Sequence, residues 1–310
     1  MTSSKKDFLT LSDLGRDGLL SLLDRSEELR RLRGTPGHPR PLVGKTVAVL
    51  FEKASTRTRI SFEVGISELG AQPLTLLSRD LQIGRGESIE DTARMLSRYV
   101  HAIAYRTFGH DRVQALAENA SIPVINALTE LHHPLQALAD LMAVRAATEG
   151  RLEGVKVAWI GDGNNVAHSW IEAASLVGLD LVLACPPTHR PDAGILKAAA
   201  ATGRGRVTVV ESPDDAVRGA NVLTTDVWAS MGQEGEAEDR KRVFAGYSVT
   251  AARMALAAPG AIFLHCLPAH RGEEVDAAVI DGPQSRVWDE AENRLHTQKA
   301  LLERLVGGAR

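Results

Sequence analysis

The chain has 310 residues, of which 44% are hydrophobic and 24% are charged, and its formal net charge is −3. This is the composition of a globular protein long enough for two domains, each with its own core. The slightly negative charge and an aromatic content of 4% argue against a nucleic-acid partner.

Cysteine usage and hydropathy indicate where the protein works. Cys185 and Cys266 are the two cysteines, and they stand far apart in unlike surroundings, which is neither a disulfide framework nor a zinc pattern. The opening residues MTSSKKDFLTLSDLG lack the apolar core of a signal peptide, and no run approaches the ~20 apolar residues of a membrane span. We therefore expect a soluble cytoplasmic protein without a membrane partner.

The first half of the chain predicts helices alternating with strands. A helix is expected over 8–35, where Gly34 and Pro36 end it, and residues 78–87 form a polar, glycine-bearing loop. Strands are predicted at 46–51, 73–77, 101–105 and 122–126, and further helices at 56–69, 88–99, 110–118 and 134–149.

The second half repeats this alternation. Strands are predicted at 155–160, 179–184, 207–210, 221–225 and 261–264, a helix at 166–177, and a last helix at 290–307. The pattern predicts an α/β protein with two doubly wound, mostly parallel-sheet domains. We expect a first domain over 1–145, a second over 146–288, and a C-terminal helix over 289–310 that returns to the first domain.

Polar side chains follow six of the predicted strands or the loops after them. In open parallel sheets, ligands bind beyond the carboxyl ends of the strands. The pattern therefore predicts an active site in the interdomain cleft. The six residues are Ser55, Arg106, His133, Asp162, Asp226 and Cys266.

The turn Ser55-Thr56-Arg57-Thr58-Arg59 joins a predicted strand to a predicted helix. Backbone N–H groups and the positive end of the helix dipole converge on such a turn. Arginine is disfavoured in a first helical turn, which prefers acidic residues, so two arginines indicate a bound anion between them.

Several segments resemble the aspartate/ornithine carbamoyltransferase family. The STRTR turn resembles its carbamoyl phosphate motif, and His133-Pro134-Leu135-Gln136 resembles the motif whose His and Gln contact the carbamoyl group. The segments at 226–232 (DVWASMG) and 265–272 (HCLPAHRG) resemble the ornithine enzymes of the family specifically, in which an acidic residue suits an amine-bearing substrate.

The resemblance implies a role for each matching residue. Cys266, Arg106, His133 and Arg57 would be catalytic. The carbamoyl phosphate ligands would be Ser55, Thr56, Arg57, Thr58, Gln82, Arg106, His133, Gln136, Cys266, Leu267 and Arg294. The ornithine ligands would be Asn165, Asp226, Ser230 and Met231.

The implied reaction transfers the carbamoyl group of carbamoyl phosphate to L-ornithine and yields L-citrulline and phosphate, as in arginine biosynthesis. It needs no metal or organic cofactor, and the sequence contains no cluster of ligand residues for one. The family is trimeric, so a homotrimer or a multiple of trimers is expected, with the loop around Gln82 reaching a neighbouring subunit. Whether Cys266 acts as a thiolate or as a thiol stays open.

Three alternatives remain. A carbamoyltransferase for another amine, such as putrescine or acylornithine, would share the first domain but differ in the 226–232 and 265–272 segments. A nicotinamide dehydrogenase is suggested by the glycine turn Gly161-Asp162-Gly163, yet Val166 stands where the third glycine of the dinucleotide fingerprint belongs. A non-catalytic amino-acid binding module would have little use for four candidate catalytic residues.

Overall fold

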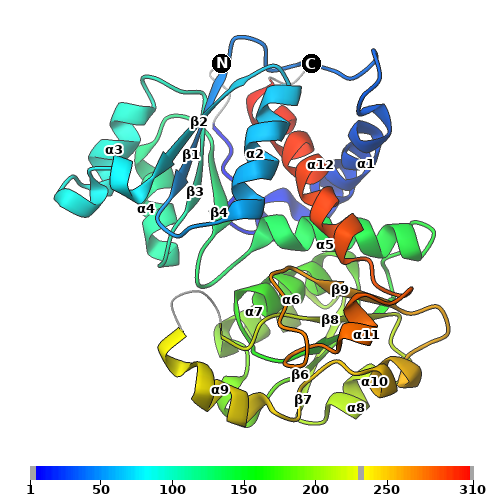
Figure 1. The fold of residues 1–310 in the computed structure, drawn as a ribbon. Helices are drawn as coiled ribbons and strands as arrows, with labels where there is room; N and C mark the ends of the chain where they lie inside the picture. The colour runs from blue at the N-terminus through cyan, green and yellow to red at the C-terminus, as the bar shows by residue number, and fades with distance from the viewer. Residues whose placement is uncertain (1–4, 230–233, 308–310) are drawn as a thin grey trace. The chain divides into compact units, whose positions relative to one another are not determined.

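The computed structural model describes residues 5–229 and 234–307. The chain forms two compact units (Figure 1). Unit 1 comprises Met1–Leu138 and Asn293–Arg310, and unit 2 comprises Ala139–Glu292. The two chain crossings between units fall inside helices, α5 (Pro134–Ala147) and α12 (Val287–Val306).

Unit 1 contains a four-stranded, wholly parallel sheet with the strand order β2-β1-β3-β4. The strands are β1 (Thr46–Phe51), β2 (Gln72–Leu77), β3 (Ala102–Arg106) and β4 (Val124–Leu128). The helices are α1 (Gly15–Leu32), α2 (Thr56–Glu68), α3 (Ile89–Leu96) and α4 (His110–Asn119), besides parts of α5 and α12. α3 and α4 cover one face of the sheet, and α1, α2 and α12 the other (Figure 1).

Burial explains why unit 1 has this sheet. Every residue of β3 is buried, as are five of the six residues of β1, because helices cover both faces of these central strands. One core joins strand residues such as Ile103 to Leu96 of α3 and Leu116 of α4. On the other face, α2 and α12 approach so closely that a Cβ on Gly65 would lie 3.2 Å from Leu295 and from Lys299.

Unit 2 contains a five-stranded, wholly parallel sheet with the strand order β7-β6-β5-β8-β9. The strands are β5 (Lys156–Ile160), β6 (Asp180–Ala184), β7 (Arg206–Val210), β8 (Val222–Thr225) and β9 (Ile262–His265). The helices are α6 (Asn165–Val177), α7 (Ala193–Thr202), α8 (Pro213–Val217), α9 (Ala237–Phe244), α10 (Ala251–Leu256) and α11 (Ala277–Ile280). A core cluster joins one face of β5, β6, β8 and β9 to α8, α10 and α11.

The predicted fold class is confirmed, since both units are α/β with parallel sheets. The predicted helix over 8–35 is wrong at its start, because Phe8 pairs with Ile125 beside β4, a 3-10 turn covers Leu11–Leu14, and the helix begins at Gly15. Strand β4 lies two residues later than the predicted 122–126. Among the residues that the structure describes, no helix combines the length and apolar character needed to cross a membrane.

Candidate active-site clusters

The first candidate cluster begins at the turn between β1 and α2. Ser55 is the N-cap of α2 with extended backbone (φ −159°), and its side chain makes no capping hydrogen bond. Thr56 and Arg57 are exposed, whereas Thr58 is buried. Arg59 pairs with Glu63 at 2.9 Å, but no acidic side chain in the described part of the chain pairs with Arg57. The helix N-terminus thus presents N–H groups, hydroxyls and a guanidinium, which suits an anion.

Three segments far apart in sequence meet next to this turn. Arg294 of α12 donates from one guanidinium nitrogen to Gln136 Oε1 at 2.7 Å and from another to Thr58 Oγ1 at 3.0 Å. All three side chains are almost fully buried. The structure therefore brings together Thr58, Gln136 and Arg294, which sequence reasoning had connected only through a family resemblance.

His133 lies in the same group. Burial, followed by the positive charges of Arg294, Arg106 and Arg57, lowers the pKa of this imidazole well below its usual value. The ring is therefore neutral at physiological pH. We call Arg57, Thr58, Arg106, His133, Gln136 and Arg294 the arginine cluster.

Arg106 is the last residue of β3 and is 5% exposed. The pairing of β3 with β4 shifts register between Tyr105 and Arg106, so the strand departs from regular pairing at this residue. β1 and β3 are neighbours, but their helical connections leave in opposite directions along the sheet order. The ends of these two strands thus mark the switch point at which parallel sheets bind ligands.

Gln82 is not joined to the arginine cluster. It is exposed and precedes a 3-10 turn, where its backbone carbonyl accepts from the N–H groups of Arg85 at 2.8 Å and Glu87 at 3.1 Å. The predicted loop at 78–87 contains two such turns, at Ser78–Asp80 and Ile83–Arg85.

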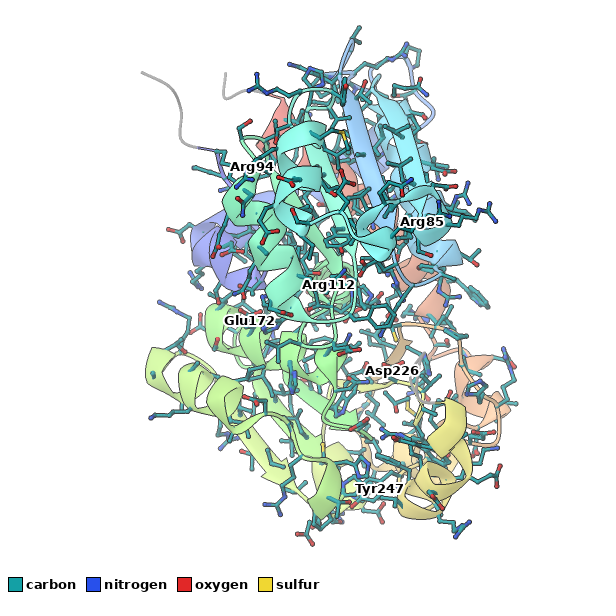
Figure 2. The ribbon with its side chains drawn as sticks, turned by 90° about the vertical axis from the view of Figure 1, so that its left-hand side faces the viewer. Arg85, Arg94, Arg112, Glu172, Asp226 and Tyr247 are labelled. Atoms are coloured by element: carbon teal, nitrogen blue, oxygen red, sulfur yellow. The ribbon has the colours of Figure 1, made fainter. Side chains whose placement is uncertain are left out.

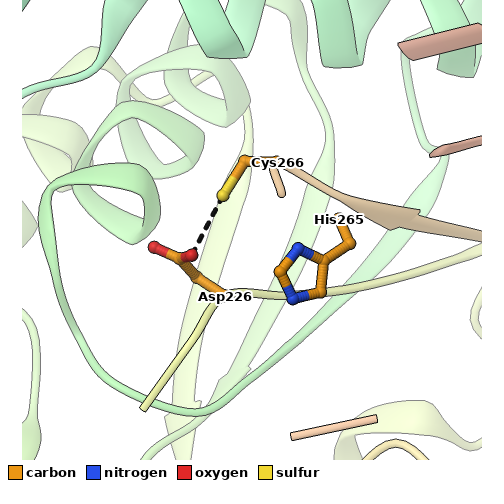
Figure 3. A group of neighbouring side chains, drawn as sticks. All are labelled: Asp226, His265 and Cys266. Atoms are coloured by element: carbon orange, nitrogen blue, oxygen red, sulfur yellow. Dashed lines mark hydrogen bonds between the residues drawn. The ribbon is translucent and has the colours of Figure 1, made fainter. Parts of the chain in front are cut away.

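Unit 2 holds the second candidate cluster, formed by residues that follow β5, β8 and β9. Its central residue, Asp226, is labelled in Figure 2. The Cys266 thiol donates to Asp226 Oδ1 at 3.0 Å (Figure 3), and Asn164 Nδ2 donates to Asp226 Oδ2 at 2.8 Å. The Val227 N–H also donates to the Asp226 carboxylate at 2.8 Å. We call Asn164, Asp226 and Cys266 the carboxylate cluster.

The protonation state of Cys266 follows from its surroundings. Burial, and then the negative charge and hydrogen bond of Asp226, raise the pKa of the Cys266 thiol well above its usual value. A thiol rather than a thiolate therefore stands beside the carboxylate. The sequence left the protonation of Cys266 open, and these surroundings favour the thiol.

Leu267 has a left-handed backbone, with φ 56°. Its N–H donates to His265 Nδ1 at 2.9 Å, so the ring proton sits on Nε2, which lies 3.2 Å from Glu274 Oε1. His265 and Glu274 are buried. Sequence reasoning missed the hydrogen bond between His265 and Glu274, because it joins residues nine apart across a loop.

Asn164, which the sequence did not single out, contacts the Asp226 carboxylate and also caps α6 through the Val166 and Ala167 N–H groups. Its signal in the sequence is an asparagine immediately before a helix. The expected ornithine ligand Asn165 is the first residue of α6. Ser230 and Met231, the other two expected ligands, lie outside the described residues.

The glycine turn after β5 has a packing explanation. A Cβ on Gly163 would lie 2.2 Å from the Pro191 backbone nitrogen, so only glycine fits. This close approach accounts for Gly163 without a bound dinucleotide.

Two groups of side chains have ligand atoms close enough to hold a metal ion, a feature that the sequence did not reveal. Within residues 5–229 and 234–307 they are Asp226, His265 and Cys266 (Figure 3), and His270, Glu273 and Glu274. In the first group the thiol keeps its proton and donates it to the carboxylate, whereas a metal ligand would be a thiolate. Hydrogen bonding accounts for this group as it stands.

Two family models match the chain. The model described as "Aspartate/ornithine carbamoyltransferase, carbamoyl-P binding domain" matches residues 6–146. The model described as "Aspartate/ornithine carbamoyltransferase, Asp/Orn binding domain" matches residues 153–305.

Curated relatives and solved structures agree with these matches. The ornithine carbamoyltransferase of Halorhodospira halophila is 53% identical over 303 residues, which is 98% of this chain and 99% of the relative. The structure of ornithine carbamoyltransferase from Pyrococcus furiosus superposes with a TM-score of 0.93 at 47% identity and covers 99% of both chains. That of anabolic ornithine carbamoyltransferase from Campylobacter jejuni gives a TM-score of 0.92 at 37% identity, covering 97% of this chain and 98% of the other.

Proposed function

The chain belongs to the aspartate/ornithine carbamoyltransferase family, and from this premise we propose that it transfers the carbamoyl group of carbamoyl phosphate to the side-chain amine of L-ornithine. The products are L-citrulline and phosphate. Relatives named ornithine carbamoyltransferase at about half identity over nearly the full chain support this acceptor, and do not favour putrescine or acylornithine. The single structural observation that carries the proposal is the hydrogen-bonded pair of Asp226 and Cys266, a site suited to an amine.

The arginine cluster binds carbamoyl phosphate. Ser55, Thr56 and Thr58 supply hydroxyls, and Arg57 supplies charge at the N-terminus of α2, where the helix dipole favours an anion. These groups stabilise the charge that gathers on phosphate as it leaves. Gln82 is a further ligand in this proposal, contributed by a neighbouring subunit.

The carbamoyl group is polarised by Arg106, His133 and the backbone of Leu267. A neutral His133 donates one hydrogen bond to the carbamoyl oxygen without giving up its proton, and Arg106 supplies positive charge. Gln136 and Arg294, already joined at 2.7 Å, complete this end of the site. Donors held in place before the reaction stabilise the oxyanion of the tetrahedral intermediate.

The attacking amine must lose a proton before it reacts. A free alkylamine titrates near pKa ~10.4, so only about one molecule in a thousand is neutral near pH 7. The Asp226 carboxylate binds the ammonium form, and Asp226 and Cys266 together place the amine and handle its proton. Cys266 then holds Asp226 and the amine in line with the carbamoyl carbon.

We assign the two substrates to separate domains. Residues 1–145 bind carbamoyl phosphate, and residues 146–288 bind ornithine. Residues 289–310 bring Arg294 back to the arginine cluster. Asn165, Asp226, Ser230 and Met231 are the proposed ornithine ligands, and Asn164 orients Asp226. The reaction requires both clusters to act on one pair of substrates.

Three finer features belong to the same proposal. The enzyme serves arginine biosynthesis, acts in the cytoplasm and assembles as a homotrimer or a multiple of trimers. Two free thiols, Cys185 and Cys266, are compatible with a reducing compartment. Light scattering tests the assembly, and a catalytically competent monomer would contradict the trimer.

An assay of carbamoylated product tests the function. Carbamoyl phosphate is supplied with ornithine, putrescine, acetylornithine or aspartate in parallel reactions. Citrulline from ornithine, with kcat/KM at least about 100-fold above that for the other amines, is the expected result. Preferential carbamoylation of another amine would overturn the choice of acceptor, and no carbamoylation of any of them would overturn the function.

A further inference from the structure

We propose that Glu52 is a positioning residue for the carbamoyl phosphate site and that Arg112 and Thr107 hold its carboxylate in place. Glu52 follows β1 and precedes the Ser55–Thr58 turn, and Thr107 follows Arg106. The inference rests on the proposed function, because it assigns a purpose to groups behind the proposed phosphate ligands.

The carboxylate of Glu52 is held by three donors. Arg112 of α4 donates from Nη2 to Glu52 Oε1 at 2.5 Å and from Nε to Oε2 at 3.2 Å, a two-pronged contact that fixes the plane of the carboxylate. The Thr107 hydroxyl donates to Glu52 Oε2, and Arg112 Nε also reaches the Thr107 hydroxyl at 3.1 Å. Side-chain exposure is 11% for Glu52 and 33% for Arg112.

The backbone links this group to Arg106. The Glu52 N–H donates to the Arg106 carbonyl at 2.9 Å, and the Thr107 N–H donates to the Leu128 carbonyl at 3.1 Å. Arg106 sits where the pairing of β3 with β4 loses its regular register. The sheet alone therefore constrains this strand end less well, and Glu52 adds a backbone hydrogen bond to Arg106 and a side-chain hydrogen bond with the next residue, Thr107. One side chain thereby couples the turn that carries Ser55 and Arg57 to the strand end that carries Arg106.

Because Glu52 is negatively charged, losing Arg112 should harm carbamoyl phosphate binding more than losing Glu52. Burial opposes ionisation of Glu52, but the hydrogen bonds from Arg112 and Thr107 outweigh it and hold the pKa of the carboxyl below its usual value. Glu52 is thus an anion close to a site for an anion. Arg112 compensates that charge, so its loss would leave an unpaired carboxylate that both moves and repels the substrate.

This reasoning predicts an unusual order among variants. Arg112→Met should weaken carbamoyl phosphate binding most, because it leaves the Glu52 charge uncompensated. Glu52→Gln should weaken it less, since the neutral amide still accepts from Thr107. The double variant should bind better than Arg112→Met alone, because it removes the repelling charge. If the contact between Glu52 and Arg112 only stabilised the fold, the double variant would bind carbamoyl phosphate at least as weakly as either single variant.

The test uses the 310-residue chain, four variants of it and one control. Arg94→Met is the matched control, because Arg94 of α3 also bridges an acidic residue and a neighbouring helix, pairing with Asp91 at 3.0 Å and Asn119 at 2.8 Å. Arg94 and Arg112 lie well apart within unit 1 (Figure 2). The variants are Arg112→Met, Arg112→Lys, Glu52→Gln and the Glu52→Gln/Arg112→Met double change. Calorimetry gives the Kd for carbamoyl phosphate, steady-state kinetics give both KM values and kcat, and thermal melting reports stability.

For Arg112→Met we expect Kd and KM for carbamoyl phosphate to rise about 10- to 30-fold while KM for ornithine stays within about twofold. The double variant should bind carbamoyl phosphate about threefold more tightly than Arg112→Met, Arg112→Lys should bind it more tightly still, and Arg94→Met should match the parent protein.

A folded Arg112→Met protein with unchanged Kd for carbamoyl phosphate would overturn the inference. Equal losses of affinity for both substrates, or a double variant that binds more weakly than Arg112→Met, would overturn it as well. If Arg112→Met does not fold, Glu52→Gln decides, and an unchanged Kd there overturns the inference. Failure of the parent protein to bind carbamoyl phosphate would instead contradict the proposed function.

Discussion

The arginine cluster and the carboxylate cluster use one topological position for opposite chemistry. In each unit, polar groups follow neighbouring strands at the switch point of a parallel sheet, β1 and β3 in unit 1 and β5 and β8 in unit 2. The first cluster gathers guanidinium groups around an imidazole whose pKa is lowered by burial and then by these positive charges. The second gathers a carboxylate, an amide and a thiol whose pKa is raised by burial and then by the carboxylate.

The difference shows how side chains at strand ends define what a common fold binds. A site rich in arginine raises the affinity for a phosphate and lowers the pKa of a nearby histidine. A site with aspartate attracts an ammonium group and raises the pKa of a nearby cysteine. In each cluster, the surrounding charges shift the pKa of the titratable residue in the same direction as burial does.

The largest expected effect is on the use of carbamoyl phosphate by the arginine cluster. Arg57→Ala should reduce kcat/KM for carbamoyl phosphate about 10³-fold, because it removes the exposed guanidinium at the N-terminus of α2. Arg59→Ala is the control, since Arg59 is already paired with Glu63 at 2.9 Å, and its loss should be much smaller. Binding measured by calorimetry distinguishes the two variants. Near-normal affinity in Arg57→Ala would remove this residue from the phosphate site.

The next largest effect is expected at the carboxylate cluster. Cys266→Ala should lower kcat about 100-fold while the Kd for carbamoyl phosphate changes less than about threefold, because the thiol acts on Asp226 at 3.0 Å. Cys185→Ala is the matched control, because that cysteine is buried and its pKa is raised to about 12 by burial, so it is an inert thiol. Stopped-flow and calorimetric measurements supply kcat and Kd. Parallel losses in turnover and carbamoyl phosphate binding would contradict the role given to Cys266.

A smaller effect is expected at the C-terminal helix. Arg294→Met should weaken carbamoyl phosphate binding about tenfold, because it breaks charged hydrogen bonds to Gln136 and Thr58. Arg304→Met on the same helix serves as control, since the side-chain hydrogen bond that Arg304 makes among the described residues goes to the Gly18 carbonyl, at 3.1 Å. Equal affinities of the two variants would show that Arg294 has no part in binding this substrate.

The smallest effect concerns stability and pH. The folded-state pKa of His133 is depressed, so below the unfolded value of about 6.5 the unfolded chain binds a proton that the folded protein does not. Stability is therefore lost as pH falls through that value, by at most about 1.4 kcal/mol per pH unit from this residue. His133→Asn should show a smaller fall in melting temperature between pH 7.5 and 5.5 than the parent protein. An identical fall in His133→Asn would contradict the depressed pKa.

Local pattern determined much of the architecture before any tertiary contact was known. Strand β1 occupies the predicted residues 46–51 because five successive apolar side chains are buried on both faces. Helix α5 begins at Pro134 as predicted, since proline suits the first helical position. The strand ends then located Arg106, Asp226 and Cys266, because the rule that ligands bind at strand ends needs only the order of elements.

Tertiary structure alone decided which side chains touch. No local signal relates Thr58, Gln136 and Arg294, which are joined by two hydrogen bonds across three helices. The contact between Asn164 and Asp226 depends on the direction in which α6 starts, and the protonation of Cys266 and His133 depends on burial and on charges from distant segments. Residue identity and spacing thus determined the elements and the chemistry on offer, whereas hydrogen bonds and pKa values, which depend on distances of a few ångströms, followed only from the folded chain.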